Sequence, residues 1–182
     1  MGQGHAFKCK KCGHEYSVHP GVGMMYPSVF REKLAEIAEG AYGTELKDLI
    51  NNTDYAAIDA SRVVYICSFC NRWELGTDVT LYAPNEPESI AKKQYGILTV
   101  EEWGYVPYVS HRDLEREYHV LKRYYHKCEK CGRCMHKASD EEEKNLSCPN
   151  CGEPNKAEEK FIFWISGVAN HDRQIQNHYP LW

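Results

Sequence analysis

The sequence predicts a small α+β protein with two β units, a helical insertion in the first unit and an aromatic connector between the units. Three observations support this fold class. Four short cysteine-containing turns each follow a strand-like segment. Apolar residues at helical spacing fill the interval between the first two turns, and aromatic residues are frequent between the second and third turns.

The expected elements follow from the residue pattern along the chain. Alternating apolar residues predict strands before the cysteine turns and after the second turn, at 6–8, 62–66, 73–75, 79–82, 124–127 and 144–147. A core strand at 161–165 is expected to complete the second unit. Helices are predicted after the N-cap candidates Ser28, Thr44 and Ser110, and over 86–95 with Pro87 in the first turn. We expect the two inserted helices to cover the sheet of the first unit, because a bare unit of this size buries little core.

These elements divide the chain into four parts. Residues 1–83 form the first β unit with its helical insertion at 28–52, residues 84–119 form the connector, and residues 120–168 form the second β unit. Residues 169–182 form a C-terminal tail that ends in Tyr179-Pro180-Leu181-Trp182. An apolar end of this kind docks on its own domain or on a partner, and docking on its own domain is the expectation.

Composition excludes several classes of protein. The chain has 182 residues, of which 42% are hydrophobic and 26% charged, so it is neither disordered nor fibrous. Its longest apolar runs have five residues, far below the ~20 that span a bilayer. Met1 to Cys9 contains no apolar stretch of the signal-peptide kind, so a cytoplasmic location is expected. The formal net charge of -4 argues against a polyanion binder that acts by bulk attraction.

Eight of the nine cysteines form four Cys-x-x-Cys pairs, a spacing that directs two thiols toward one point. Glycine follows three of the pairs and Asn71 follows the remaining one, and these residue types tolerate a positive φ angle. An odd cysteine count and the absence of a secretory segment disfavour disulfides. The predicted ligands of two metal ions are Cys9, Cys12, Cys67, Cys70, Cys128, Cys131, Cys148 and Cys151.

Four pairs can share two ions in three ways. Sequential sharing closes loops of 54 residues (13–66) and 16 residues (132–147), and the second loop has the usual length between zinc-binding pairs. An interleaved arrangement would tie residues 9 and 151 into one body and needs longer closures. We therefore expect sequential sharing, with the interleaved arrangement left open.

The segments Phe7 to Gly13 and Leu146 to Gly152 resemble the knuckles of zinc-ribbon proteins, which are small antiparallel β units that hold a four-cysteine zinc site. The second segment also resembles the knuckle of rubredoxin, which binds iron in a similar cage. Rubredoxin has a longer segment between its knuckles than the 16 residues here, so the resemblance implies Zn²⁺, two ions per chain. Zinc ribbons serve transcription, translation and adaptor proteins alike, so the module indicates a fold more firmly than a role.

Four thiolates leave a zinc ion no open coordination position, so both sites are expected to be structural and no catalytic residue is predicted. Cys134 extends the third pair to Cys-x-x-Cys-x-x-Cys. It is a free thiol in this interpretation, either redox-sensitive or a replacement ligand, or more simply a semi-buried neighbour of the metal. None of the nine histidines, His136 included, has the spacing of a catalytic zinc motif.

Basic and aromatic residues interleave over 120–138, a pattern that single-stranded nucleic-acid binding uses. The candidate contacts are Lys122, Arg123, Tyr124, Tyr125, Lys127, Lys130, Arg133 and Lys137. The predicted function is a non-catalytic zinc protein that acts as a protein-interaction or adaptor module, with a protein partner and no membrane. Nucleic-acid binding is the alternative, and a redox or metal-dependent enzyme is the third.

Overall fold

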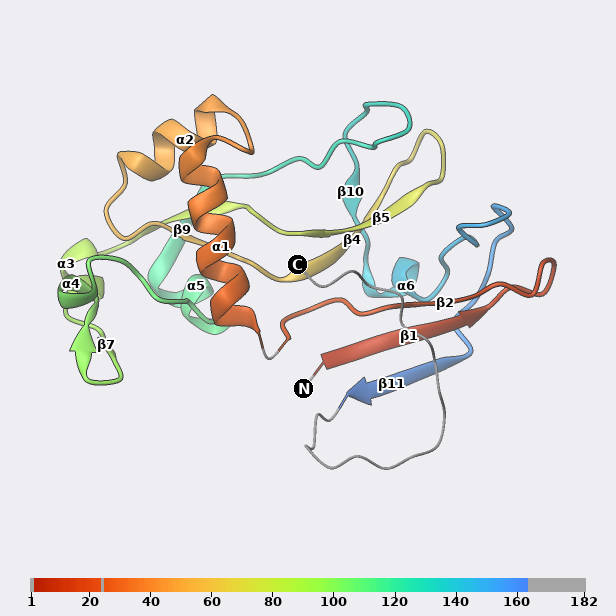
Figure 1. Ribbon diagram of the computed structural model, residues 1–182, viewed down its shortest axis with the longest axis horizontal. Coiled ribbons are helices and arrows are strands. Elements are labelled where there is room, and N and C mark those ends of the chain that lie inside the picture. The colour runs from red at the N-terminus through yellow and green to blue at the C-terminus, as the bar shows by residue number, and fades with distance from the viewer. Residues whose placement is uncertain (1, 24, 164–182) are drawn as a thin grey trace.

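The computed structural model describes residues 2–23 and 25–163 (Figure 1). Its helices are α1 (Tyr26–Glu39), α2 (Thr44–Asn51), α3 (Pro87–Ala91), α4 (Val100–Trp103), α5 (His111–Glu117) and α6 (Asp140–Glu143). Its strands are β1 (Gly2–Lys8), β2 (Glu15–Val18), β3 (Ala57–Ile58), β4 (Arg62–Ile66), β5 (Trp73–Thr77), β6 (Leu81–Pro84), β7 (Gln94–Tyr95), β8 (Leu98–Thr99), β9 (Tyr118–Lys122), β10 (His136–Lys137) and β11 (Glu159–Phe163). The predicted α+β class is confirmed.

The strands form small antiparallel sheets in the orders β11-β1-β2, β10-β4-β5, β3-β6-β9 and β7-β8. Two of these sheets join segments that lie far apart in the sequence. Gly2 pairs with Phe163 and Ala6 pairs with Glu159, so β1 and β11 lie side by side (Figure 1). Likewise, β10 pairs with β4. Both sheets with cysteine turns therefore combine the first and second halves of the chain.

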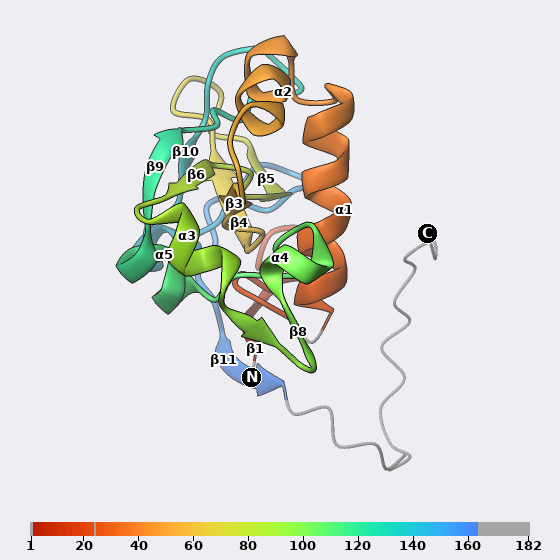
Figure 2. The same cartoon turned by 90° about the vertical axis from the view of Figure 1, so that its left-hand side faces the viewer.

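The largest apolar core lies in a helical lobe, built from α1 to α5 and the sheet β3-β6-β9. Fully buried side chains from each part of the lobe meet there, among them Phe30, Ile37, Ile58, Leu81 and Leu114. In Figure 2, α1 and α2 stand to one side of β3, β6 and β9. The expectation that the inserted helices cover the sheet of the first cysteine unit is wrong, because this separate sheet receives their apolar faces.

Local signals in the sequence predict some helix boundaries and miss others. The helix expected over 86–95 is α3, which ends at Ala91, and residues 94–95 form β7. The Ser110 hydroxyl accepts a hydrogen bond from the Asp113 amide at 3.2 Å and caps α5, as expected. Pro87 stands in the first turn of α3, also as expected. α1 begins at Tyr26, before Ser28, and Gly43 rather than Thr44 occupies the N-cap position of α2.

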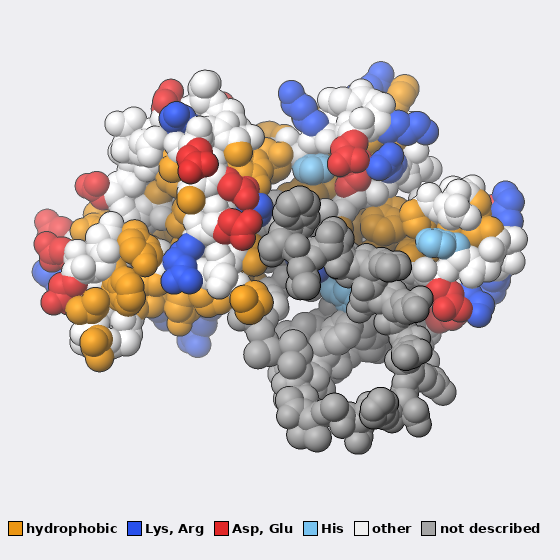
Figure 3. Space-filling view, in the orientation of Figure 1, with side chains coloured by type: hydrophobic (Ala, Val, Ile, Leu, Met, Phe, Trp, Pro, Cys, Tyr) orange, Lys and Arg blue, Asp and Glu red, His pale blue; other side chains and the backbone are white. Residues whose placement is uncertain are grey.

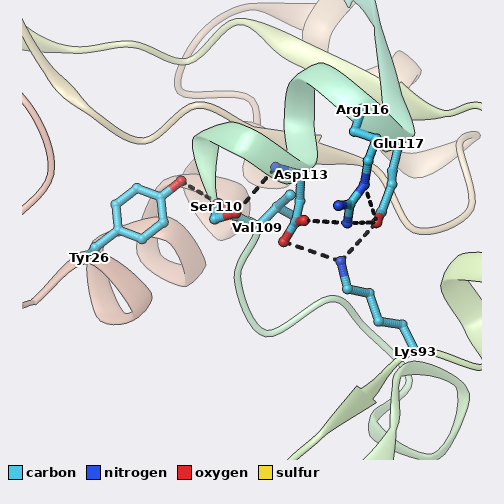
Figure 4. A network of polar contacts seen from close by, with 7 residues as sticks. All are labelled: Tyr26, Lys93, Val109, Ser110, Asp113, Arg116 and Glu117. Atoms are coloured by element: carbon cyan, nitrogen blue, oxygen red, sulfur yellow. Dashed lines mark hydrogen bonds and ion pairs between the residues drawn. The ribbon is translucent and has the colours of Figure 1, made fainter.

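A polar network joins α1, α5 and the segment after α3 (Figure 4). The Tyr26 hydroxyl donates to the Val109 carbonyl at 2.7 Å. Lys93 reaches Glu117 at 2.7 Å and Asp113 at 3.2 Å, and its hydrogen bond lowers the pKa of Glu117. These contacts fix α5 against the rest of the helical lobe.

Several expected strands differ from the structure. The strand predicted at 124–127 is wrong, because Lys127 forms only an isolated bridge with Cys134. The strand of this region is β9, which ends at Lys122, pairs with β6 and buries Tyr118 in the helical lobe. Residues 144–147 are not a strand, because the capping box of Ser139 and Glu142 starts α6 directly before them. The predicted core strand 161–165 is described to Phe163 and pairs with β1. The tail 169–182 lies outside the described residues.

No helix in residues 2–23 and 25–163 is both long and apolar enough to cross a membrane.

Replacing Leu81 by alanine should lower the free energy of unfolding by about 2–5 kcal/mol, because its side chain is fully buried in the core of the helical lobe. Urea unfolding followed by circular dichroism measures this change. Val120→Ala is the control: Val120 lies on β9, beside β6, with 41% of its surface exposed, and should cost less than about 1 kcal/mol. Equal losses in the two variants would contradict the assigned core.

Candidate metal centres

The four Cys-x-x-Cys turns, here called knuckles, share one backbone conformation. In each, the amide of the first cysteine donates to the carbonyl five residues later, at 2.8–2.9 Å. The carbonyl of that cysteine accepts from the amide four residues later, also at 2.8–2.9 Å. The residue after each second cysteine has a positive φ angle: 71° at Gly13, 53° at Asn71, 68° at Gly132 and 73° at Gly152. The conformation predicted for these four positions is confirmed.

The first group of thiols, the outer site, combines the first knuckle with the last. The Sγ atoms of Cys9 and Cys151 lie 3.6 Å apart, and those of Cys12 and Cys148 lie 3.7 Å apart. All four Sγ atoms fall within 4.8 Å of one another. The pairing of β1 with β11 brings these knuckles together, although more than 130 residues separate them.

The second group, the inner site, combines the two middle knuckles. The Sγ atoms of Cys67 and Cys131 are 3.5 Å apart, and those of Cys70 and Cys128 are 3.6 Å apart. Here too the four Sγ atoms lie within 4.8 Å of one another. The strand β4 leads into Cys67 and β10 follows the third knuckle, so the β4–β10 pairing aligns the two.

Both groups fit a tetrahedral metal ion. An ion with four sulfur ligands at about 2.3 Å places those sulfurs about 3.8 Å apart, close to the observed separations. The eight predicted ligands therefore come together in two groups that could each hold a metal ion, and zinc suits a four-thiolate set.

The expectation of sequential sharing is wrong, and the sites are nested instead. The first pair shares a site with the fourth, and the second pair shares a site with the third. The short 132–147 loop does not close a site, because it contains β10 and α6. β10 pairs with β4 beside the inner site, whereas the segment after α6 leads to the last knuckle in the outer site. Loop-closure entropy rises slowly with length, so strand pairing easily outweighs the shorter closure.

Backbone amides stabilise the thiolate form of the cysteines. In every knuckle, the second cysteine accepts a hydrogen bond from the amide two residues later, which belongs to His14, Arg72, Arg133 or Glu153. The His14 amide lowers the pKa of Cys12 to about 6, and the Cys70 amide lowers that of Cys67 to about 6. Burial and the neighbouring thiols outweigh the amides at Cys70, Cys131 and Cys151, whose pKa values are raised. Since metals bind thiolates, Cys12 and Cys67 are the thiols best prepared for ligation near neutral pH.

An aromatic stack that the sequence did not reveal connects the two sites. The ring of Phe7, on β1, stacks on Tyr16 at 4.7 Å, and Tyr16 contacts Trp73, on β5, at 5.9 Å. The Tyr16 hydroxyl donates to the Leu146 carbonyl at 2.8 Å, and the Trp73 indole donates to the Ser147 carbonyl at 2.7 Å. Both bonds hold the segment that leads into Cys148, so the stack positions the last knuckle.

Cys134 lies outside both thiol groups, and its side chain is exposed rather than semi-buried. It forms a β-bridge with Lys127 at the end of the third knuckle. His136 lies between the Ser68 hydroxyl, 3.2 Å from Nδ1, and Glu142, 3.0 Å from Nε2. These three side chains lie at or near the surface, and the contact connects the inner site to α6.

The predicted nucleic-acid contacts divide into two sets. Lys122 pairs with Glu45 at 2.6 Å, Lys137 pairs with the buried Asp78, and Tyr124 packs edge-on against Tyr42. Lys137 stays exposed despite its ion pair, with 42% of its side chain accessible. The other exposed candidates are Arg123, Tyr125, Lys127, Lys130 and Arg133.

One exposed aromatic residue beside these cations was not predicted. The guanidinium of Arg133 stacks over the ring of Phe69 at 3.5 Å, and 63% of Phe69 is exposed. Cationic side chains gather over the β4–β5 hairpin and the loop before β10, at the upper right of Figure 3. Phe69 lies in the second knuckle, which carries no basic residue between its cysteines, so charge patterning did not reveal it.

Comparison of the chain with protein-family models, with curated proteins and with solved structures found no match in any of the three.

Nested sharing predicts how many metal ions are lost when two cysteines are replaced together. The double variant Cys9→Ser/Cys148→Ser should lose one equivalent of metal, because both residues belong to the outer site. The double variant Cys9→Ser/Cys67→Ser should lose two equivalents, one from each site. Native mass spectrometry of the purified variants counts the ions.

Cys134→Ser serves as the control and should keep the full metal content, because Cys134 lies outside both groups. Sequential sharing makes the opposite prediction, in which Cys9→Ser/Cys148→Ser loses two equivalents and Cys9→Ser/Cys67→Ser loses one.

Proposed function

We propose that this chain is a non-catalytic zinc protein in which two structural tetracysteine sites hold a protein-interaction, or adaptor, module together. The observation that carries the proposal is the convergence of four equivalent knuckles on two sets of four thiols, each within 4.8 Å of one another. In this proposal each site is a zinc ribbon assembled from distant parts of the chain, with one knuckle from each half.

Zinc is the proposed ion because it has no redox chemistry and accepts a closed tetrahedral set of four thiolates. The loop-length argument for zinc over iron no longer applies, since it depended on the 132–147 loop, and the choice now rests on the structural role of the sites. All nine cysteines are free thiols. A reducing compartment preserves such thiols, which supports the cytoplasm as the proposed location.

Exposed apolar side chains in the helical lobe support a protein partner. Ile97, at the tip of the β7–β8 turn, is 90% exposed, and Trp103, Tyr105 and Tyr108 follow within the next turns of the chain. Figure 3 shows hydrophobic side chains along the lower left edge, over β7 and its neighbours. Clusters of this kind commonly mark contact surfaces with other proteins.

Metal analysis and metal removal test the structural role. Native mass spectrometry should give two zinc ions per chain, and the solution should lack the visible absorption of iron–thiolate sites. Removal of the ions by a chelator should abolish amide protection in β1, β4, β10 and β11, because each ion contributes on the order of 10 kcal/mol to folding. A metal-free chain with those strands still protected, or a protein purified with iron, would contradict the proposal.

Binding of single-stranded nucleic acid is the second candidate, and the Arg133–Phe69 stack beside exposed Lys130 favours it. Fluorescence anisotropy with a labelled oligothymidine should then show an affinity that falls steeply with salt, and Phe69→Ala should weaken it about fivefold or more. The exposed but distant Tyr105→Ala is the control. Absence of binding at low salt by the fully metal-loaded chain would remove this candidate.

A further inference from the structure

A cavity of about 320 Å³ lies between the two candidate metal centres. Three of its lining residues are direct sequence neighbours of metal-ligand candidates: Asn71 follows Cys70, Ser147 precedes Cys148, and Gly152 follows Cys151. Its walls thus come from both nested sites, and its shape depends on both being closed.

One wall of the cavity is aromatic. Trp73 lines the space, and its indole is held by the 2.7 Å hydrogen bond to Ser147 and by the contact with Tyr16. Ile66 and Leu146 extend this apolar wall. Because its polar N–H is already bonded, Trp73 presents a fixed aromatic surface to an incoming group.

The cavity is also lined by two acidic residues of α6, Glu141 and Glu142. Glu142 is held by the capping box, where it accepts hydrogen bonds from the Ser139 amide and hydroxyl, each at 2.9 Å. The Ser139 amide is the main reason that the pKa of Glu142 falls to about 2, so this carboxylate is ionised at neutral pH.

Glu141 is the more accessible of the two carboxylates. Its side chain is 77% exposed. It contacts Lys144 at 3.4 Å and accepts a hydrogen bond from the side-chain Nδ2 of Asn145 at 3.2 Å. His136 contacts Glu142 at 3.0 Å. Lys144 and His136 do not line the cavity, so the described charged groups that face it are the two glutamates.

We propose that this cavity binds the cationic side chain of an arginine or lysine in an extended segment of a partner protein. A guanidinium or ammonium group is attracted to an aromatic face and to carboxylates. Hydrogen bonds hold Trp73 and Glu142 in place here, and Glu141 adds an accessible second carboxylate. This inference rests on the proposed adaptor function and names the chemistry of the partner that it recruits.

The surface beyond the cavity favours a peptide over a free amine. A second hollow, of about 550 Å³, shares Asn145 and Pro154 with the first and continues to Lys10 and Lys156. Its remaining lining residues are Asn155, Ala157 and Glu158. The first hollow thus carries two carboxylates, and the second carries two lysines and the single carboxylate of Glu158. This arrangement complements an extended chain that carries a basic residue and, at a distance from it, an acidic one.

Titration of the metal-loaded, ¹⁵N-labelled full chain with the peptide Ac-Ala-Arg-Ala-NH₂ tests the proposal. The indole N–H of Trp73 and the amide of Ser147 should shift in the NMR spectrum with a saturable dependence on peptide concentration. The isosteric norleucine peptide, which lacks the charge, should leave both signals in place.

Matched charge variants complete the test. Glu141→Gln should weaken arginine-peptide binding about two- to fivefold, as expected for one accessible carboxylate. Glu101→Gln is the matched control and should not change the affinity. Glu101 is the second residue of α4, as Glu141 is of α6, and both helices begin with a capping box.

Three results would overturn the proposal: no shift with the arginine peptide, equal shifts with the norleucine peptide, or an unchanged affinity in Glu141→Gln. Methylguanidinium that binds as tightly as the peptide would overturn the assignment of a peptide partner. Native mass spectrometry of the same sample separates these failures from failure of the proposed function. A chain without two metal ions contradicts the proposed function, whereas a loaded chain that ignores the peptide contradicts only the inference.

Discussion

Each thiol group is closed by two cysteine pairs from opposite halves of the chain, and this nested closure determines where the other elements lie. The outer group joins residues 9–12 to residues 148–151, and the inner group joins residues 67–70 to residues 128–131. The buried apolar clusters around these knuckles are small: one centres on Phe7, Val18, Val64 and Leu146, and the other on Tyr65 and Met135 beside the cysteines. Cores of this size stabilise little, so strand pairing and, in the proposed function, metal ligation would supply most of the closure.

The helical lobe obeys a different constraint. Its core consists of aliphatic and aromatic side chains from five helices and the sheet β3-β6-β9. It meets the cysteine-bearing sheets where β3 leads into β4 and β5 leads into β6. Asp59 and Asp78 shape these two crossings, each accepting a hydrogen bond from the amide two residues later. The Asp78 amide also donates to the Ser61 carbonyl at 2.8 Å, and Lys137 of β10 pairs with its buried carboxylate. The crossings thereby link the apolar core to the inner site.

The local structure was readable from the sequence wherever the deciding contacts are local. Positive φ angles after each second cysteine follow from residue type, and the cap of α5 follows from Ser110 and Asp113. Which cysteine pairs form one thiol group could not be predicted from the sequence, because it depends on strands that pair across most of the chain. The same limit applies to the inserted helices: their apolar faces indicated burial, but the sheet that receives them is assembled from three separated segments. Phe69 and the cavity beside Trp73 are likewise products of tertiary packing.

The walls of the cavity come from two nested thiol groups, so metal binding and the proposed partner binding would be linked. Asn71 and Trp73 belong to the inner unit, whereas Ser147 and Gly152 belong to the outer one. An ion in either group would therefore hold part of the wall in place. A ligand that binds only the closed form stabilises that form by an amount set by its concentration relative to its dissociation constant. By thermodynamic reciprocity, a bound peptide would raise the combined affinity for the two ions by the factor by which the two ions together raise the affinity for the peptide. In this protein a structural ion would therefore also control access to the binding surface, without any open coordination position.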